Sequence, residues 1–447
     1  MSLPTSSIPQ PQTTGKYLVL LNEEQVDTGI QVLSDRTGIQ NFAHARDFAD
    51  APPPEQLASN EPLVFDNLGV AVVSLDPEQL QAANIAVASS SALLTIEPER
   101  IVYAIQNPRL LPFGEDVPQV PSSDSVSVSI DYLKGYRDGV NQLVDSILQS
   151  ERAVAEEFSS LASNAEFTWG LQQTKVNTSS HSGLGIKVAV LDTGMDLTHP
   201  DFVGRTIVEK SFIEGETVQD GNGHGTHCIG TACGSRLPAV LPRYGVAYNA
   251  EIYAGKVLSN EGSGADGGIL GGINWAIASG CPIISMSLGA RVLPGQKYSD
   301  VYEQVAQRAL AQGTLIIAAA GNDSFRQFGL VFPVSHPANC PSILAVAAVT
   351  DKLRPASFSN GGTQPDGGQI DIAAPGVDIY SSWFMPTRYN TISGTSMATP
   401  HVAGIAALYA EATGARGQEL WSQLTRNALR LSSRSRDVGN GLAQAIQ

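Results

Sequence analysis

Three residues that could act as nucleophile, general base and orienting carboxylate lie in separate segments of this chain. Asp192 ends the apolar run VAVLD, His224 lies within DGNGHGTHC, and Ser396 lies within SGTSMATPH. A serine hydroxyl is a weak nucleophile, so it needs a base such as histidine to accept its proton. A carboxylate beside that base holds the imidazole in one tautomer and stabilises its charged form. The three residue types therefore indicate acyl-transfer chemistry.

The elements around these residues would bring them together. Apolar runs separated by helical segments predict a parallel α/β sheet, with strands at residues 186–191, 251–257, 283–286, 314–320 and 343–349. The first strand delivers Asp192 to its carboxyl end, where functional groups gather in open α/β sheets. Ser396 precedes an apolar helix containing Pro400, so free N–H groups at the start of that helix would face a developing oxyanion. We expect this catalytic unit to span residues 166–447.

The order Asp192, His224, Ser396 resembles that of the subtilisin-like serine peptidases, and it differs from the orders in chymotrypsin-like enzymes and α/β-hydrolases. The resemblance covers residues 165–447 and includes Asn322 in AAAGND, which matches the oxyanion-hole asparagine of that family. It implies a three-layer α/β sandwich with a mostly parallel sheet. It also implies a serine endopeptidase that needs no cofactor for its chemistry, with the three residues as its catalytic triad.

The resemblance further implies a peptide-binding groove with two backbone edges. A substrate would join these edges as an added strand, held by main-chain hydrogen bonds and selected by side-chain pockets. Ala318 and Ala320, with their neighbours, would wall the primary pocket and favour an uncharged residue before the cleaved bond. Asp266 either favours a basic residue further upstream or is a solvated loop carboxylate. The implied groove residues are Gly262, Ser263, Gly264, Ser287, Leu288, Gly289, Ala319 and Gly321.

Calcium is the one ion that the resemblance suggests. Asp371, with the carbonyl oxygens of Pro341 and Ile343, matches a recurrent weak structural site of the family. Oxygen ligands are those that Ca²⁺ takes. A strand-end carboxylate with a purely structural role is an equal alternative.

Residues 16–106 predict a small α+β module before the catalytic unit. We expect strands at residues 16–21, 93–96 and 100–105, one long strand or a hairpin at residues 63–75, and helices at residues 23–33 and after Asp76. This order resembles the ferredoxin-like inhibitory prodomain of the family. Its tail, Gln106 and Asn107, would enter the groove and block it. The chain would then be a self-inhibited zymogen that cleaves itself between residues 106 and 168.

The remaining segments carry no predicted chemistry. Residues 1–15 are typical of a disordered polar leader, and residues 107–165 of a linker with one amphipathic helix. The apolar stripe of that helix indicates packing on a neighbour rather than on a membrane: Ile130, Leu133, Tyr136, Val140, Leu143, Ile147 and Leu148.

We expect structural roles for His199, His227 and His401. Buried thiols are expected at Cys228, Cys233, Cys281 and Cys340, although three pairings stay open.

Composition limits the partners of the chain. It has 447 residues, a formal net charge of −16 and 16% charged residues. An acidic chain with few cations is a poor partner for nucleic acid or for an anionic membrane, and no run reaches the roughly 18 apolar residues of a membrane span. Because no signal peptide is visible, we expect a cytoplasmic enzyme, with secretion as the alternative. Peptides or proteins would be its substrates.

Two other functions stay open at this point. One is a dedicated intracellular protease that processes a single peptide precursor. The other belongs to a different class, a self-inhibited peptide-binding protein that does not hydrolyse its ligand. Labelling of the serine by a fluorophosphonate would separate an enzyme from a binding protein.

Overall fold

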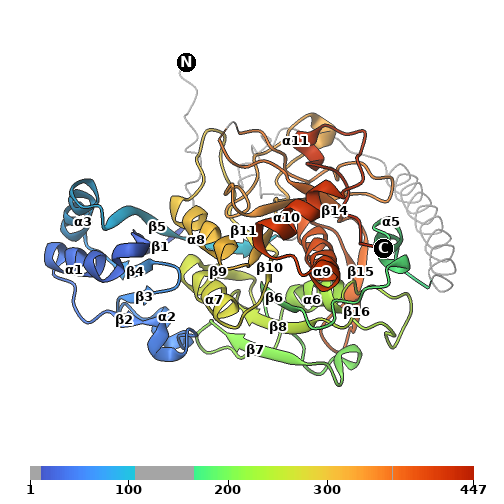
Figure 1. Cartoon of the computed structure of the whole chain (residues 1–447), viewed down its shortest axis with the longest axis horizontal. Coiled ribbons are helices and arrows are strands. Elements are labelled where there is room, and N and C mark those ends of the chain that lie inside the picture. Colours follow the sequence, from blue (N-terminus) through green and yellow to red (C-terminus); the bar gives the residue numbers. More distant parts are fainter. Residues whose placement is uncertain (1–11, 106–165, 365) are drawn as a thin grey trace, which may run out of the picture.

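The computed structural model describes residues 12–105, 166–364 and 366–447. We refer to residues 12–105 as the N-terminal module and to residues 166–447 as the C-terminal module. The first eleven residues of the expected leader, residue 106 and the expected linker with its helix lie outside the described residues. In Figure 1 the N-terminal module, in blue, lies at one end of the molecule, beside helices α7 (Asp266–Ala278) and α8 (Asp300–Ala311).

A seven-stranded parallel sheet forms the centre of the C-terminal module, in the order β14-β13-β12-β10-β6-β8-β7. The five predicted strands are confirmed to within one residue at each end. Two strands were missed: β7 (IVEKS) is apolar only at its first two positions, and β14 (IAAP) contains only one large apolar residue. The strands are β6 (Lys187–Asp192), β7 (Ile207–Ser211), β8 (Glu251–Lys256), β10 (Ile283–Met286), β12 (Leu315–Ala319), β13 (Leu344–Val349) and β14 (Ile372–Pro375).

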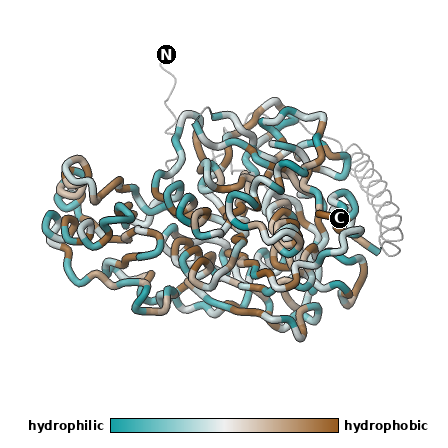
Figure 2. Tube along the Cα trace, in the orientation of Figure 1, coloured by the Kyte–Doolittle hydropathy of each residue, from teal (hydrophilic) through white to brown (hydrophobic). Residues whose placement is uncertain are grey.

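Helices cover both faces of this sheet. Successive side chains of a strand point to opposite faces, so Ala189 and Leu191 of β6 pack toward α7 and α8. Val188 and Val190 pack on the other face, toward α6 (His224–Cys233), α9 (Thr395–Thr413) and α10 (Gly417–Arg426). The result is the predicted three-layer α/β sandwich. Figure 2 shows hydrophobic stretches through the interior and hydrophilic residues along the outer loops.

Shorter elements complete the C-terminal module. The hairpin of β15 (Ile379–Ser382) and β16 (Tyr389–Ile392) lies against α6, where Ser382 Oγ donates to the carbonyl of Thr226 at 2.8 Å. Strands β9 (Ser263–Ala265) and β11 (Leu288–Gly289) lie apart from the main sheet. Helices α5 (Trp169–Gln173) and α11 (Ser435–Val438) are short. Within the described ranges, no helix is long and apolar enough to cross a membrane.

The N-terminal module has the predicted ferredoxin-like order. Its antiparallel strands follow the order β5-β1-β4-β3. Residues 63–75, which were expected to form one long strand or a hairpin, form a hairpin. Helix α3 starts at a capping box of Asp76 and Gln79, which satisfies its first N–H groups. The elements are β1 (Thr13–Leu21), α1 (Val26–Thr37), β2 (Ala43–His44), α2 (Pro54–Ala58), β3 (Leu63–Phe65), β4 (Val70–Ser74), α3 (Pro77–Ser89) and β5 (Leu93–Ala104).

Two expected boundaries of this module were wrong. Strand β1 starts at Thr13, inside the segment expected to be a disordered leader, because Thr13 pairs with Arg100. The strands expected at residues 93–96 and 100–105 are one strand, β5. Pro98 does not interrupt β5, because the pairing with β1 is irregular at that point.

Candidate active site

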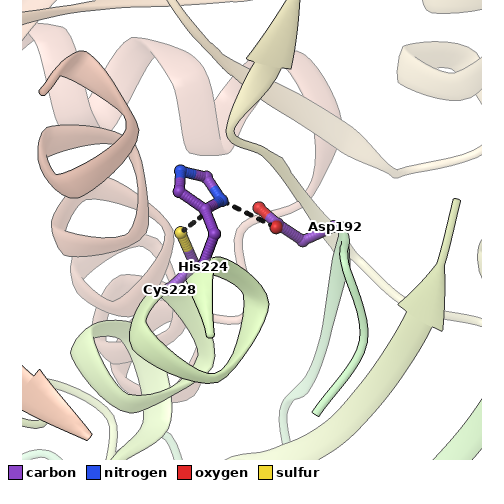
Figure 3. Close-up of side chains that lie close together, drawn as sticks. All are labelled: Asp192, His224 and Cys228. Carbon is purple, nitrogen blue, oxygen red and sulfur yellow. Dashed lines mark hydrogen bonds and ion pairs between the residues drawn. The ribbon is translucent and has the colours of Figure 1, made fainter. Parts of the chain in front are cut away.

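Asp192 and His224 form a buried pair at the carboxyl end of the central sheet. β6 ends at Asp192, and His224 is the first residue of α6. His224 Nδ1 lies 2.7 Å from Asp192 Oδ1, and both side chains are almost completely buried (Figure 3). The same Oδ1 accepts the backbone N–H of Thr193 at 2.7 Å. An ionised carboxylate can only accept, so His224 donates from Nδ1 and leaves Nε2 free to take a proton.

The surroundings of His224 favour its charged form. Burial by itself lowers the pKa of His224, but the charge and hydrogen bond of Asp192, with a smaller effect of Cys228, raise it well above 6.5. Cys228 Sγ lies 3.9 Å from His224 Nδ1 (Figure 3). Burial raises the pKa of the Cys228 thiol above 9.0, so the thiol stays protonated and is a poor nucleophile near neutral pH.

Asp220 organises the loop before α6, and the sequence analysis missed it. Its Oδ1 accepts the N–H groups of Asn222 and Gly223 at 2.9 and 2.8 Å, and its Oδ2 accepts the N–H of Thr226 at 2.9 Å. Thr193 Oγ1 donates to Asp220 at 3.0 Å and accepts from the N–H of Gly225 at 2.8 Å. The segment after Asp192 is thereby tied to the helix that carries His224. The sequence signal that could have revealed Asp220 is an aspartate just before Gly-Asn-Gly at a helix start, because an aspartate oxygen accepts from the free N–H groups there.

Ser396 lies in the first turn of α9, and Pro400, one turn later, leaves the Ser396 carbonyl without its usual helical hydrogen bond. Pro400 has no N–H to bond the carbonyl four residues earlier. The Ser396 carbonyl instead accepts from Ser287 Oγ at 2.8 Å and from Cys228 Sγ at 3.5 Å. A proline inside the helix therefore couples the serine to the groove edge and to α6.

The Ser396 hydroxyl faces the end of the N-terminal module. Its Oγ lies 2.6 Å from the carbonyl oxygen of Ile105 and 3.1 Å from that of Ser287. His224 Nε2 is buried and has no hydrogen-bond partner among the described residues. The structure thus joins Asp192 to His224 but does not form a hydrogen bond between His224 and Ser396.

Asn322 contacts the same carbonyl as Ser396. Asn322 follows β12, and its Oδ1 accepts both the N–H and the hydroxyl of Thr395 at 2.9 Å. These bonds turn the amide nitrogen toward the groove, where Nδ2 lies 3.2 Å from the carbonyl oxygen of Ile105. A hydroxyl and an amide donor therefore converge on the oxygen of one peptide carbonyl, a position where hydrogen-bond donors can stabilise a developing oxyanion.

Strand β5 fills the implied groove between its two edges. On one side Val102 and Tyr103 pair with Gly264 and Ser263, and the N–H of Ala104 donates to the carbonyl of Gly262 at 2.9 Å. On the other side Ala104 and Tyr103 pair with Leu288 and Gly289, and the N–H of Ile105 donates to the carbonyl of Ser287 at 3.2 Å. All six implied edge residues thus contact β5 or the residue that follows it.

Glycine is required at Gly289 because His336 and Ile105 both approach it closely. A Cβ there would lie 2.5 Å from the carbonyl oxygen of His336 and 3.0 Å from Ile105 Cδ1. Ala319 and Gly321 are buried beside Asn322, and the N–H of Gly321 donates to Thr395 Oγ1 at 3.1 Å. A contact of Ala319 and Gly321 with substrate stays a prediction.

The expectation of a solvated loop carboxylate at Asp266 is wrong. Asp266 is the first residue of α7 and is completely buried. Its Oδ2 accepts the backbone N–H of Arg100 at 2.9 Å, and Oδ1 lies 3.3 Å from His336 Nε2. Packing of the N-terminal module against α7 excludes water from this carboxylate.

Asp371, the one carboxylate of the expected calcium site, is hydrogen-bonded to the backbone. Its Oδ2 accepts the N–H of Ala345 at 2.8 Å, and burial raises its pKa to about 7. Within the described part of the chain it belongs to no group of three or more His, Cys, Asp or Glu side chains that could hold a metal ion. One carboxylate supplies few of the six to eight oxygens that Ca²⁺ takes, so the residues fit this ion poorly and calcium stays a prediction.

The remaining histidines and cysteines have structural surroundings. His227 Nε2 lies 2.9 Å from the carbonyl of Ile379, and His401 Nδ1 lies 2.7 Å from that of Met397. Burial lowers the pKa of His227 to about 3 and that of His401 to about 4, so both are neutral. His199 Nε2 lies 2.7 Å from the carbonyl of Arg388. All four cysteines are buried and free, which confirms the expected thiols.

Comparison with known families decides which class of enzyme this site belongs to. The sequence profile of the Subtilase family, Peptidase_S8, matches residues 183–444, which carry every residue of the site described above except those of the N-terminal module. The chain belongs to the subtilase family. This subtilase is therefore a serine-type endopeptidase that acts on peptides or proteins, and the chemistry of its family needs no cofactor.

Three relatives illustrate how far the similarity extends. Subtilisin DY of Bacillus licheniformis is 39% identical over 239 residues, covering 53% of this chain and 81% of that protein. Subtilisin E of Bacillus subtilis strain 168 is 41% identical over 245 residues, covering 54% of this chain and 60% of that protein. The cuticle-degrading protease of Metarhizium anisopliae is 34% identical over 352 residues, covering 72% of this chain and 83% of that protein.

Proposed function

We propose that this subtilase is a self-inhibited zymogen that cuts its own Ile105–Gln106 bond with the triad Asp192, His224 and Ser396. The observation that carries the proposal is the position of the Ile105 carbonyl, 2.6 Å from Ser396 Oγ and 3.2 Å from Asn322 Nδ2. This bond lies just before the interval from residue 106 to residue 168 that the sequence suggested.

The proposed reaction uses only groups of this chain and water. Ser396 Oγ attacks the carbonyl carbon of Ile105 while His224 Nε2 takes the hydroxyl proton, and Asp192 stabilises the imidazolium. Asn322 Nδ2 stabilises the negative oxygen. His224 then gives the proton to the nitrogen of Gln106 as the C–N bond breaks. Water, with His224 again as base, releases Ile105 as a free carboxylate and restores Ser396.

Contacts on α7 and α8 support an inhibitory role for the N-terminal module. Leu18 and Leu20 of β1 face the core shared with these helices, whereas Val19 and Leu21 face α1 and α3 of their own module. Burying one sheet face on the protease stabilises the docked state through apolar area removed from water.

Two carboxylates of β5 fix the docked module to the starts of these helices. Glu99 accepts the N–H of Gly267 in α7 at 2.9 Å, and Glu97 accepts the N–H of Asp300 in α8 at 2.7 Å. Each satisfies a helix N-terminal donor and interacts favourably with the positive end of that helix. We propose that this module remains in the groove after cleavage and holds the enzyme inactive until it leaves.

The residues that occupy the groove also suggest the preferred substrates. Val102 is completely buried and Ile105 is partly buried, whereas Tyr103 is 43% exposed. We propose that the enzyme prefers an apolar residue before the cleaved bond and a second apolar residue three positions upstream. The two alternatives of the sequence analysis, a protease for one precursor and a non-hydrolytic binding protein, are favoured by no contact described here.

The cleavage site can be measured directly on the full chain. After expression and purification, we expect a fragment that begins at Gln106 and one that ends at Ile105, because this is the bond presented to Ser396. Intact-mass spectrometry and N-terminal sequencing identify both ends. Ile105→Asp, which places a charge in an apolar site, should slow the cut, whereas the exposed control Ile85→Asp should not. A first cut elsewhere in residues 107–165, with Ile105–Gln106 intact, would contradict the proposal.

Removing the amide of Asn322 should slow catalysis without weakening binding. For Asn322→Ala we expect kcat to fall by about 10²–10³, because the side-chain donor acts mainly on the oxyanion, and KM to change by less than about threefold. Hydrolysis of a Val-Tyr-Ala-Ile p-nitroanilide by the self-processed enzyme, once the N-terminal module has left the groove, measures both constants. Asn427→Ala, an exposed asparagine after α10, is the control. A change confined to KM would remove Asn322 from the oxyanion site.

A further inference from the structure

The buried Asp266 contacts the groove strand beyond the two glycine-rich edges. Pairing of β5 with β9 ends at Ile101, which faces Ala265. The next residue toward the N-terminus, Arg100, donates its backbone N–H to Asp266 Oδ2 at 2.9 Å. A side-chain oxygen thus takes the place of a backbone carbonyl and extends the pairing to the sixth residue before the proposed cleavage site.

The side chain of Arg100 is held against the C-terminal module near the same carboxylate. Its Nη1 lies 4.0 Å from Asp266 Oδ2, and only 14% of the side chain is exposed. It lines a small pocket together with Ala290, Val292, Ser299 and His336, and Arg291 and Lys297 also line this pocket. A guanidinium among these residues needs a negative partner on the protease, because Arg291 and Lys297 repel it.

Two carboxylates face this guanidinium, and they belong to different modules. Glu97 Oε2 accepts from Arg100 Nη2 at 3.2 Å, but Glu97 is part of the N-terminal module and departs with it. Asp266 is in α7 and stays with the protease. Burial lowers the pKa of its other neighbour, His336, so that imidazole is neutral near pH 7 and does not neutralise the carboxylate.

We propose that Asp266 forms a distal subsite that selects a basic side chain six residues upstream of the cleaved bond. It binds the main-chain N–H of that residue through one hydrogen bond and its positive charge through an ion pair. The proposal rests on the proposed function, since it assumes that substrates follow the path of β5. It deepens that function by naming a residue outside the glycine-rich edges that determines specificity.

The test compares two peptides on the full-length chain after it has processed itself and its N-terminal module has left the groove. The substrates are the p-nitroanilides of Arg-Ile-Val-Tyr-Ala-Ile and Gln-Ile-Val-Tyr-Ala-Ile, which differ only in the sixth residue. We expect kcat/KM to be about three- to tenfold higher for the arginine peptide in low salt, with the preference falling as ionic strength rises. Equal values for the two peptides in the wild-type enzyme would overturn the proposal, whatever the variants do.

Two variants assign the preference to Asp266. Asp266→Asn keeps an oxygen for the main-chain N–H but removes the charge, so the ratio of kcat/KM between the arginine and glutamine peptides should fall to about one. Glu261→Gln removes an exposed charge next to Gly262 and should keep the preference. Persistence of the preference in Asp266→Asn would overturn the assignment. The shorter Val-Tyr-Ala-Ile substrate checks the assumption that substrates follow the path of β5. If the wild-type enzyme does not cleave this substrate, the proposed function itself has failed.

Discussion

Replacing Ser396 with alanine is expected to leave the chain uncut and to lower peptide hydrolysis by about 10⁶, the loss seen when the triad serine of a subtilisin is removed. Ser396 Oγ is the one hydroxyl described within hydrogen-bond distance of the Ile105 carbonyl. Without it no acyl-enzyme can form, and the remaining donors of the site contribute only a small residual rate. The variant should fold normally, because alanine at this position removes a single oxygen.

The measurement has two parts on the same preparations. Intact-mass spectrometry should find one uncut chain in Ser396→Ala and two fragments in the wild type, and a fluorophosphonate should label only the wild type once its groove is free. Ser393→Ala is the matched control, because Ser393 lies three residues before Ser396 and its hydroxyl donates to Asp378 rather than into the groove. Processing or labelling that survives in Ser396→Ala would exclude Ser396 as nucleophile.

For Asp192→Asn we expect kcat to fall by about 10⁴. The 2.7 Å contact with Asp192 holds the proton of His224 on Nδ1. Asparagine offers an NH₂ group to this nitrogen, which favours the tautomer with its proton on Nε2. That tautomer cannot accept the proton of Ser396. The fall should appear in kcat rather than in KM, because neither residue holds the peptide main chain.

The same variant should change the pH dependence. His224 must be neutral to act as a base, so kcat/KM rises with pH through its pKa. Because Asp192 raises the pKa of His224, the rise of kcat/KM in the wild type should have its midpoint at a higher pH than it has without this carboxylate. Asp192→Asn removes that effect, and the midpoint should move toward acid. Rates of tetrapeptide hydrolysis between pH 5 and pH 10 would show this.

The control for this prediction is Asp378→Asn, which changes an exposed aspartate with a positive φ that asparagine also adopts readily. Its profile should match the wild type. An unchanged midpoint in Asp192→Asn would mean that the rise of kcat/KM with pH reflects the titration of another group.

Some features of this protein follow from local sequence. The five predicted strands of the C-terminal module were confirmed because buried parallel strands are continuous apolar runs, a pattern that needs no knowledge of neighbours. The start of α3 at Asp76 was equally local, since a side chain caps its own helix. Asp192 could be placed at a strand end and Ser396 at a helix start for the same reason.

Other features depend on residues far apart in the chain. Only tertiary packing showed that β5 is one strand, because Pro98 is accommodated by an irregularity of its partner β1. Only packing buried Asp266, whose N–H donor comes from Arg100, 166 positions away. Local sequence cannot show burial of this kind, since it depends on which surface covers the residue.

The sequence by itself thus determined which residues could carry the chemistry and which strand or helix presents most of them. The tertiary structure decided what lies in the groove. It placed the Ile105 carbonyl at Ser396 and Asn322, while His224 Nε2 stayed without a hydrogen bond to Ser396. The physical reason is distance along the chain: periodicity and capping act within a few residues, whereas β5 enters the groove by pairing with β9 and β11, which lie far from it in the sequence.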